Sequence, residues 1–154
     1  GLTNRFAMQM QYLPSIFRYA IAALRAAVKQ KPFTANIQDQ NTSRRQELIM
    51  VTAANGRVEG GAFWIAPQAS ITDGRLNLVT IQSLNKWLIP FLLPLFLIKK
   101  ANWIPHIQSH EVATAAIEID NNVEIHADGE VIRSDQEKFS ITIIPNGLKV
   151  ICRL

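Results

Sequence analysis

From residue 33 onward, apolar and polar residues alternate in short segments, and this two-residue period predicts β-strands. The segments are rich in β-branched and aromatic residues and end at turn signals such as Asn55-Gly56, Asp73-Gly74 and Asn146-Gly147. Short strands joined by tight turns indicate a mainly β fold, an antiparallel sandwich or barrel. Strands are expected at residues 33–38, 46–54, 61–67, 75–81, 113–119, 122–127, 139–145 and 147–154.

Residues 15–30 have a different, helical period. Their apolar residues recur three or four positions apart, Ser15 after Pro14 is suited to cap the start, and Pro32 ends the pattern. The segment predicts an N-terminal amphipathic helix that packs on the sheet, with a role at a membrane surface as the alternative. The apolar stripe consists of Phe17, Ile21, Leu24 and Val28.

A second segment, residues 82–103, interrupts the strand pattern. Its apolar run of 11 residues, Leu88–Ile98, is too short to cross a bilayer, because a helix needs about 20 residues for that. Pro90 and Pro94 favour a short, bent helix. Lysine and tryptophan residues flank the run on both sides, as they do at membrane interfaces. We therefore expect one inserted apolar helix that packs on the sheet, and contact with lipid is left open.

The composition is that of an ordinary globular domain. The chain has 154 residues, of which 48% are hydrophobic and 18% charged, which is enough for one packed domain. The net charge of +4 is unevenly distributed, because the first acidic residue is Asp39 and the last third is rich in acid. The basic N-terminal third is suited to bind the phosphate of lipids or nucleic acid. Nucleic acid is the weaker interpretation, since the basic residues lie on one helix without stacking aromatic residues on a sheet.

The cysteine content and the first residues bear on location. The single cysteine, Cys152, cannot form an internal disulfide, which favours a reducing, cytoplasmic setting. The chain begins at Gly1, and its first residues lack the basic start and apolar core of a signal peptide. We interpret this as an internal start and expect the chain to be a piece of a longer protein.

Two acidic turns and a pair of glycines are the candidate chemical features. Asp73 and Asp128 each precede a glycine at a strand end, and Glu130 follows Asp128 by two residues. If the strand continued through the turn, alternation would place Asp128 and Glu130 on one side, as a general base with a neighbouring acid. An ordinary hairpin turn is the alternative. Gly60 and Gly61 allow a ligand to approach the backbone closely, although the chain has neither a GxGxxG nor a Walker A motif.

The three histidines give weaker signals. His106 and His110 are four residues apart, a spacing that binds zinc on a helix. Because Pro105 precedes them and neither a cysteine nor an HExxH motif supports them, a solvated loop is expected. His126 lies in a predicted strand beside the second acidic turn, where it either lines the same site or is an ordinary strand histidine.

Several longer segments occur in a fixed order over nearly the whole chain. They are YAIAALRAAVKQKPF, NGRVEGGAFWIAPQASITDGRLNLV, HADGEVI and FSITIIPNGLKVI. In order and spacing they resemble the second half of the bacterial diacylglycerol kinase-like lipid kinases of the YegS/BmrU type, which are related to sphingosine and ceramide kinases.

The resemblance implies a two-domain enzyme. An N-terminal α/β domain binds ATP through a GGDGT motif, and a C-terminal β-sandwich domain receives the lipid. This chain contains no GGDGT, so residues 1–154 are expected to be the C-terminal domain, inactive without its nucleotide-binding domain. In such kinases the Glu of the DGE turn accepts the proton of the lipid hydroxyl, which carries over to Glu130, with Asp128 beside it. Gly60 and Gly61 are the candidate cofactor-binding residues.

The resemblance also implies a structural magnesium ion at the A-x-x-x-D-G-x-L loop. The matched ligands are the carboxylate of Asp73 and the backbone carbonyls of Ser70 and Arg75, which are hard oxygen donors. The chain departs from the family pattern at Ala62, Arg75 and Asn77, where Gly, Leu and Asp are common. Loss of the acid at position 77 weakens the expected metal site.

The predicted function is therefore phosphorylation of a lipid hydroxyl, diacylglycerol-like or sphingoid, by a kinase that uses ATP and Mg²⁺. The expected partners are a lipid substrate at a membrane surface and the protein's own N-terminal nucleotide-binding domain, with no nucleic acid. The expected location is cytoplasmic and peripheral to the membrane. A homodimer through exposed strand edges is left open. The alternative function is a non-catalytic lipid-binding or regulatory module.

Overall fold

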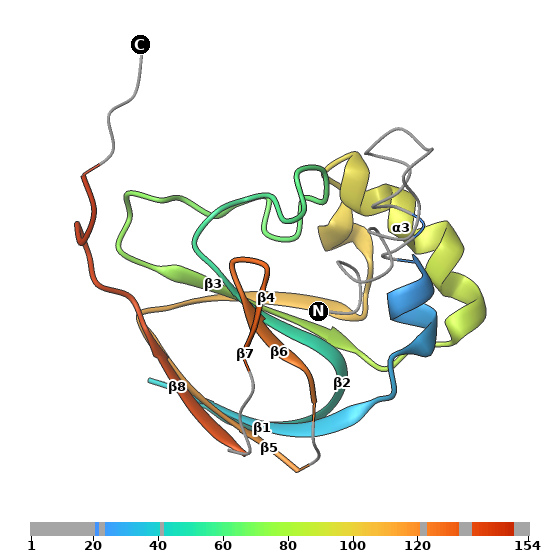
Figure 1. The fold of residues 1–154 in the computed structure, drawn as a ribbon, viewed down its shortest axis with the longest axis horizontal. Helices are drawn as coiled ribbons and strands as arrows, with labels where there is room; N and C mark the ends of the chain where they lie inside the picture. Colours follow the sequence, from blue (N-terminus) through green and yellow to red (C-terminus); the bar gives the residue numbers. More distant parts are fainter. Residues whose placement is uncertain (1–20, 22–23, 41, 121–122, 133–136, 150–154) are drawn as a thin grey trace.

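The computed structural model of the chain describes residues 21, 24–40, 42–120, 123–132 and 137–149. Within these ranges, six strands form one antiparallel sheet in the order β4-β3-β2-β1-β5-β8, and β6 and β7 form a separate hairpin (Figure 1). This architecture confirms the predicted mainly β, antiparallel fold. The strands are β1 (Phe33–Asp39), β2 (Ser43–Ala54), β3 (Leu76–Gln82), β4 (Ile107–Val112), β5 (Thr114–Ile119), β6 (Ile125–Ala127), β7 (Glu130–Ile132) and β8 (Lys138–Thr142).

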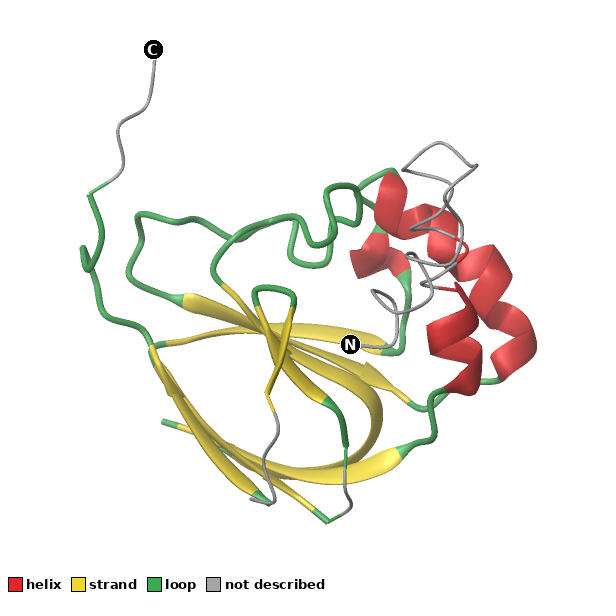
Figure 2. Ribbon diagram, viewed as in Figure 1, coloured by secondary structure: helices red, strands yellow, loops and turns green. Residues whose placement is uncertain are grey.

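The six-stranded sheet curls strongly around its main core. Strands β1, β5 and β8 lie across this core from β3 and β4, which gives the molecule the form of a sandwich (Figures 1 and 2). Alternate residues of β1 are buried here, because side chains two positions apart point to the same face of a strand. Ala35, Leu48 and Leu78, from three adjacent strands, are almost completely buried in this core.

Strand β3 is buried on both faces. Leu76 and Leu78 belong to the main core, whereas Val79 and Ile81 pack on the opposite side of the sheet. That opposite side is covered by the inserted helix and by the loop between β2 and β3. The sheet therefore holds the loop that contains the glycine pair and the Asp73 turn against its outer face.

The predicted insertion is helical. A 3₁₀ turn (Lys86–Leu88) leads into helix α3 (Ile89–Leu97), and a second 3₁₀ turn covers Ala101–Trp103. The side chain of Asn85 caps the first turn by accepting a hydrogen bond from the Trp87 amide at 3.1 Å. Ile89 and Phe96 are buried, so one face of α3 packs on the sheet as expected. In the described part of the chain, none of the helices combines the length and apolarity that crossing a membrane requires.

The predicted N-terminal helix falls largely outside the described residues. Residues 24–29 are helical, Ala26 is buried, and the Gln30 amide donates a hydrogen bond to the Ala26 carbonyl at 2.8 Å. The part of the prediction that rests on Ser15 and Phe17 lies outside the described residues.

Two predicted strands do not match the described residues, and two observed strands, β4 and β7, were not predicted. Residues 61–67 form turns, with only an isolated bridge between Glu59 and Phe63, because two positive-φ glycines bend the chain before a strand can extend. Residues 147–149 are not in a strand, and the rest of that prediction lies outside the described residues. Strand β4 was expected to be a loop, because its polar residues hide the pattern of an edge strand.

Candidate functional site

The acidic DGE motif forms the tip of the β6–β7 hairpin. Ala127 pairs with Glu130 across the hairpin, and the two residues between them, Asp128 and Gly129, have φ angles of 48° and 88°. Two positive φ angles define a tight hairpin turn, for which Asp-Gly is a preferred sequence. The strand therefore does not continue through the turn, so the condition for placing Asp128 and Glu130 on one side by alternation is not met, and the ordinary hairpin turn is the alternative that the structure shows. Both side chains are exposed.

The glycine pair forms a second tight turn. Glu59 and Phe63 exchange two backbone hydrogen bonds, of 2.9 and 3.1 Å, around the intervening residues. Gly60 and Gly61 have φ angles of 59° and 79°, which L-residues with a Cβ rarely adopt. A Cβ on Gly61 would meet no atom within 4 Å, so the backbone angle rather than space requires glycine there.

One side-chain contact joins these two turns. His126 Nε2 on β6 lies 3.1 Å from Glu59 Oε1, immediately before the glycine pair. Both side chains are partly exposed, at 41% and 44%. His126 is therefore a strand histidine with a polar partner, and that partner belongs to the glycine turn. The contact of His126 with Glu59 thus joins the segments that hold the predicted catalytic and cofactor-binding residues. The sequence left the role of His126 open and did not point to Glu59.

The predicted metal loop around Asp73 lies beside the Pro145 turn. The Arg75 amide donates to Asp73 Oδ1 at 2.9 Å, and the Thr72 amide donates to the Ser70 hydroxyl at 3.4 Å, so side chains close the loop on itself. Gly74, with φ 69°, packs against Pro145. Asp73 and Pro145 both line a small pocket of about 250 Å³ that lies between this loop and the Pro145 turn.

The donor atoms of this loop fit a hard cation in their chemistry. Asp73 Oδ1 is engaged with the Arg75 amide, while Oδ2 accepts no hydrogen bond from the described residues. Together with the carbonyls of Ser70 and Arg75, this carboxylate offers only oxygen ligands, which magnesium prefers. Across the described ranges there is no group of three or more His, Cys, Asp or Glu residues suited to hold a metal. Asp73 is the one carboxylate between residues 66 and 79.

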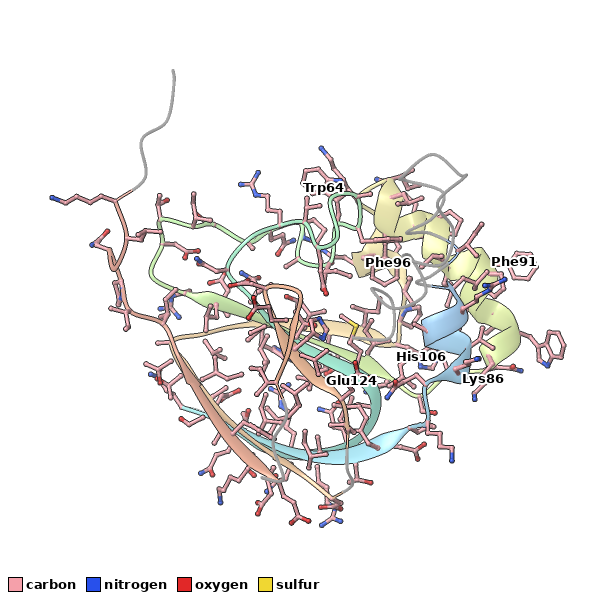
Figure 3. The ribbon with its side chains drawn as sticks, viewed as in Figure 1. Trp64, Lys86, Phe91, Phe96, His106 and Glu124 are labelled. Carbon is pink, nitrogen blue, oxygen red and sulfur yellow. The ribbon has the colours of Figure 1, made fainter. Side chains whose placement is uncertain are left out.

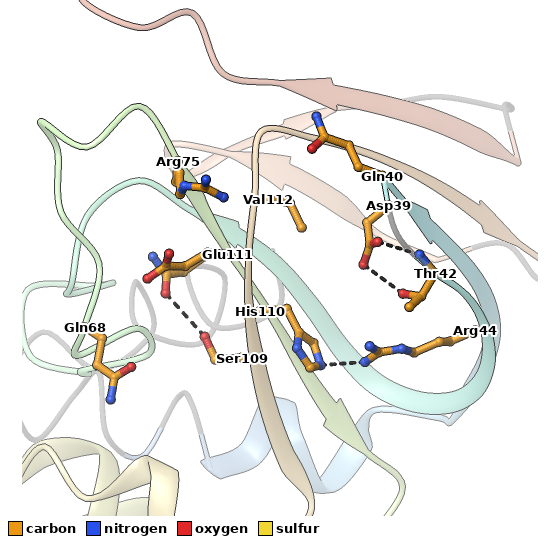
Figure 4. Close-up of a pocket in the computed structure, with 11 residues that line it drawn as sticks. Asp39, Gln40, Thr42, Arg44, Gln68, Arg75, Ser109, His110, Glu111 and Val112 are labelled. Atoms are coloured by element: carbon orange, nitrogen blue, oxygen red, sulfur yellow. Dashed lines mark hydrogen bonds between the residues drawn. The ribbon is translucent and has the colours of Figure 1, made fainter.

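A polar pocket of about 420 Å³ lies beside the metal loop, and sequence analysis did not find it (Figure 4). Arg75 borders it, and Arg44 on β2 donates to His110 Nε2 on β4 at 2.6 Å. Asn77 also lines the pocket; its Oδ1 accepts from the Ser109 hydroxyl at 3.4 Å, whereas its buried Nδ2 has no partner among the described residues. Arg44, Asn77 and the residues of β4 come from three strands, and the strand register brings them together beside Arg75, which precedes β3.

The histidine pair does not form the helical zinc site that its spacing allows. His106 lies in a turn and His110 in strand β4, so the two are not on one helix. The expectation of a solvated loop was wrong for His110, which is partly buried and bonded to Arg44.

Comparison with known proteins places the chain in a family. Residues 1–152 match the family described as the YegS C-terminal NAD kinase beta sandwich-like domain. The protein named "Probable lipid kinase YegS-like" from Citrobacter koseri is 31% identical over 136 residues, which are 88% of this chain and 43% of that protein. The chain thus spans less than half the length of this curated relative.

Solved structures share the fold. A candidate diacylglycerol kinase from Bacillus anthracis strain Sterne superposes with a TM-score of 0.63 at 21% identity, over 92% of this chain and 49% of that chain. A further diacylglycerol kinase structure from that strain gives a TM-score of 0.61 at 18% identity, over 82% of this chain and 46% of that chain. Because the family model matches residues 1–152, this chain belongs to the YegS C-terminal NAD kinase beta sandwich-like domains.

Proposed function

We propose that this chain is the lipid-receiving C-terminal domain of an ATP-dependent kinase that phosphorylates a diacylglycerol-like or sphingoid hydroxyl. The family and the name of the Citrobacter koseri relative support kinase chemistry on a lipid. The observation that carries the proposal is the contact between His126 and Glu59, which joins the acidic turn to the glycine turn. A carboxylate and a tight backbone turn held near each other are two of the parts that a phosphoryl-transfer site uses.

Glu130 is the proposed proton acceptor. Phosphoryl transfer depends mainly on alignment and charge stabilisation, with a carboxylate in hydrogen-bond reach of the attacking hydroxyl. Glu130 is exposed and is the first residue after a tight turn, so its backbone is fixed while its side chain is accessible to a substrate from outside. Asp128, at the turn itself, adds a second negative charge beside it. Gly60 and Gly61 are proposed to let the ATP phosphates approach the backbone.

The Asp73 loop is proposed to hold a magnesium ion with a structural role. The Asp73 carboxylate and the carbonyls of Ser70 and Arg75 would be its protein ligands. When bound, the ion would supply a fixed positive charge at the loop. Gly74 of this loop lies beside Pro145, in the turn that follows β8.

The proposal is tested by Glu130→Gln in the full-length protein. Transfer of labelled phosphate from ATP to diacylglycerol and to sphingosine should fall about 10²- to 10⁴-fold, the usual contribution of a general base. Glu137→Gln makes the same change at an exposed residue outside the hairpin and should keep normal turnover. Near-normal turnover of Glu130→Gln would remove Glu130 from the reaction. A parent protein that binds lipid but phosphorylates none would favour the non-catalytic module instead.

A further inference from the structure

The face of α3 that points away from the sheet is apolar and exposed. Phe91 extends outward, whereas Phe96 on the same helix points into the molecule (Figure 3). Trp87, in the 3₁₀ turn before the helix, is 82% exposed, and Phe91 is 77% exposed. Ile98 and Trp103, beyond the helix, are 60% and 69% exposed. Several large apolar side chains that are exposed within one short segment mark a candidate site of interaction.

The charged residues within the insertion, residues 82–103, are of one sign. No acidic residue occurs between Asp73 and Glu111, so the whole insertion is free of negative charge. Lys86 lies at the start of the insertion and Lys99 and Lys100 at its end. The Lys99 ammonium lies 4.0 Å from the centre of the Trp64 ring, and that of Lys100 lies 4.0 Å from the centre of the Trp103 ring. Two cations are therefore held beside aromatic rings at the same end of α3.

We propose that this surface, which we call the docking face, binds the interface of an anionic lipid bilayer. It consists of Trp87, Phe91, Ile98, Trp103, Lys86, Lys99 and Lys100. The apolar side chains enter the boundary between headgroups and acyl chains, and the lysines contact lipid phosphates. Tryptophan suits this boundary because its ring is apolar and its N–H is polar. The charge pattern favours a bilayer over an apolar groove of another protein.

The rest of the insertion permits docking without unfolding. Ile89 and Phe96 stay in the core on the opposite side of α3, and Leu92 and Leu93 pack partly against it. The docking face can therefore enter the interface while the sheet and the Asp73 loop keep their structure. The proposal concerns contact with a bilayer and goes beyond the proposed function, because a domain that binds membranes need not phosphorylate a lipid.

Vesicle sedimentation of the purified protein tests the proposal. The vesicles are phosphatidylcholine alone, or phosphatidylcholine with one quarter phosphatidylglycerol. Replacing Trp87 and Phe91 together by serine should weaken binding to the mixed vesicles by at least about tenfold, because two large apolar groups no longer enter the interface. The matched control replaces Ile144 and Leu148 by serine; these side chains are 77% and 81% exposed but lie outside the docking face, and binding should be unchanged.

A second pair of variants tests the charge. Lys86→Gln should weaken binding to the anionic vesicles about fivefold, the contribution of one lysine near such a surface, and should lower the sensitivity of binding to salt. Lys149→Gln removes the same charge from an exposed residue near the other end of the described chain and should have no such effect.

Two results would overturn the proposal. If the Trp87 and Phe91 double variant keeps its circular dichroism spectrum and binds vesicles as tightly as the parent, the docking face does not contact lipid. If light scattering shows a dimer in the parent that is lost in this variant, while vesicle binding persists, the face joins two copies of the chain.

Discussion

His126 and Glu59 are 67 residues apart in the sequence, and their side chains meet at 3.1 Å. The contact ties the acidic hairpin to the glycine turn. Because both side chains are more than a third exposed, an ion pair at this position contributes only about 0–1 kcal/mol to the free energy of unfolding. The contact positions the hairpin relative to the glycine turn, so under the proposed function its loss is expected to affect turnover more than stability.

A double-mutant cycle of Glu59→Gln and His126→Gln tests this under the proposed function. Each single variant should lower kinase turnover about tenfold, which corresponds to about 1.4 kcal/mol in the activation free energy. The double variant should lose no more than either single variant, because both remove the same contact. Melting temperatures should stay within a few degrees of the parent. Turnover losses that multiply in the double variant would show that the two residues act independently.

The glycine turn gives a prediction about stability alone. Gly61→Ala should lower the free energy of unfolding by about 1 kcal/mol, because alanine must adopt a left-handed backbone conformation there. Gly56→Ala is the matched control, since its backbone does not require a positive φ and a Cβ would meet no atom within 4 Å. Urea unfolding of both variants measures the difference. Equal stability of Gly61→Ala and the parent would show that the turn relaxes at no cost.

Much of the sheet follows from local sequence pattern. Strand β3 was expected at residues 75–81 and is observed at Leu76–Gln82, where four apolar residues are buried together with Asn77 and Thr80. Strand β2 begins earlier than expected, at Ser43, since its polar first residues pair with the end of β1. Edge strand β4 was missed because its sequence, IQSHEV, shows no regular alternation of apolar and polar residues. Such a strand forms through backbone hydrogen bonds to its neighbour, and the local pattern of residue types does not predict these bonds.

The candidate site was predictable only in its parts. The Asp128-Gly129 turn and the glycine pair carry local turn signals, so their backbone geometry was accessible from sequence. The contact of His126 with Glu59, and that of Arg44 with His110, each join distant segments through the folded sheet. Long-range contacts of this kind depend on strand register and on loop paths, which residue types do not specify.

The position of β3 between two cores gives a third prediction. Leu78 is only 2% exposed, so Leu78→Ala should lower the free energy of unfolding by about 2–5 kcal/mol, the usual cost of such a cavity. Leu148→Ala removes the same atoms from a side chain that is 81% exposed and should change stability by less than about 0.5 kcal/mol. Denaturant unfolding of both variants provides the comparison. A small effect at Leu78 would mean that the surrounding strands collapse into the cavity.

The Asp73 loop gives a prediction that needs no kinase assay. If the loop binds Mg²⁺, the parent should gain about 1.4 kcal/mol in unfolding free energy at a free Mg²⁺ concentration ten times the dissociation constant. Asp73→Asn keeps an oxygen that accepts from the Arg75 amide, so the loop should fold without metal, but the charge that attracts the cation is lost. Asp128→Asn, in the acidic hairpin, should respond to Mg²⁺ like the parent. Thermal unfolding with MgCl₂ and with EDTA separates these cases. Equal stabilisation of Asp73→Asn and the parent by MgCl₂ would place the cation elsewhere. An Asp73→Asn protein that is already less stable than the parent in EDTA would show that the carboxylate stabilises the turn itself.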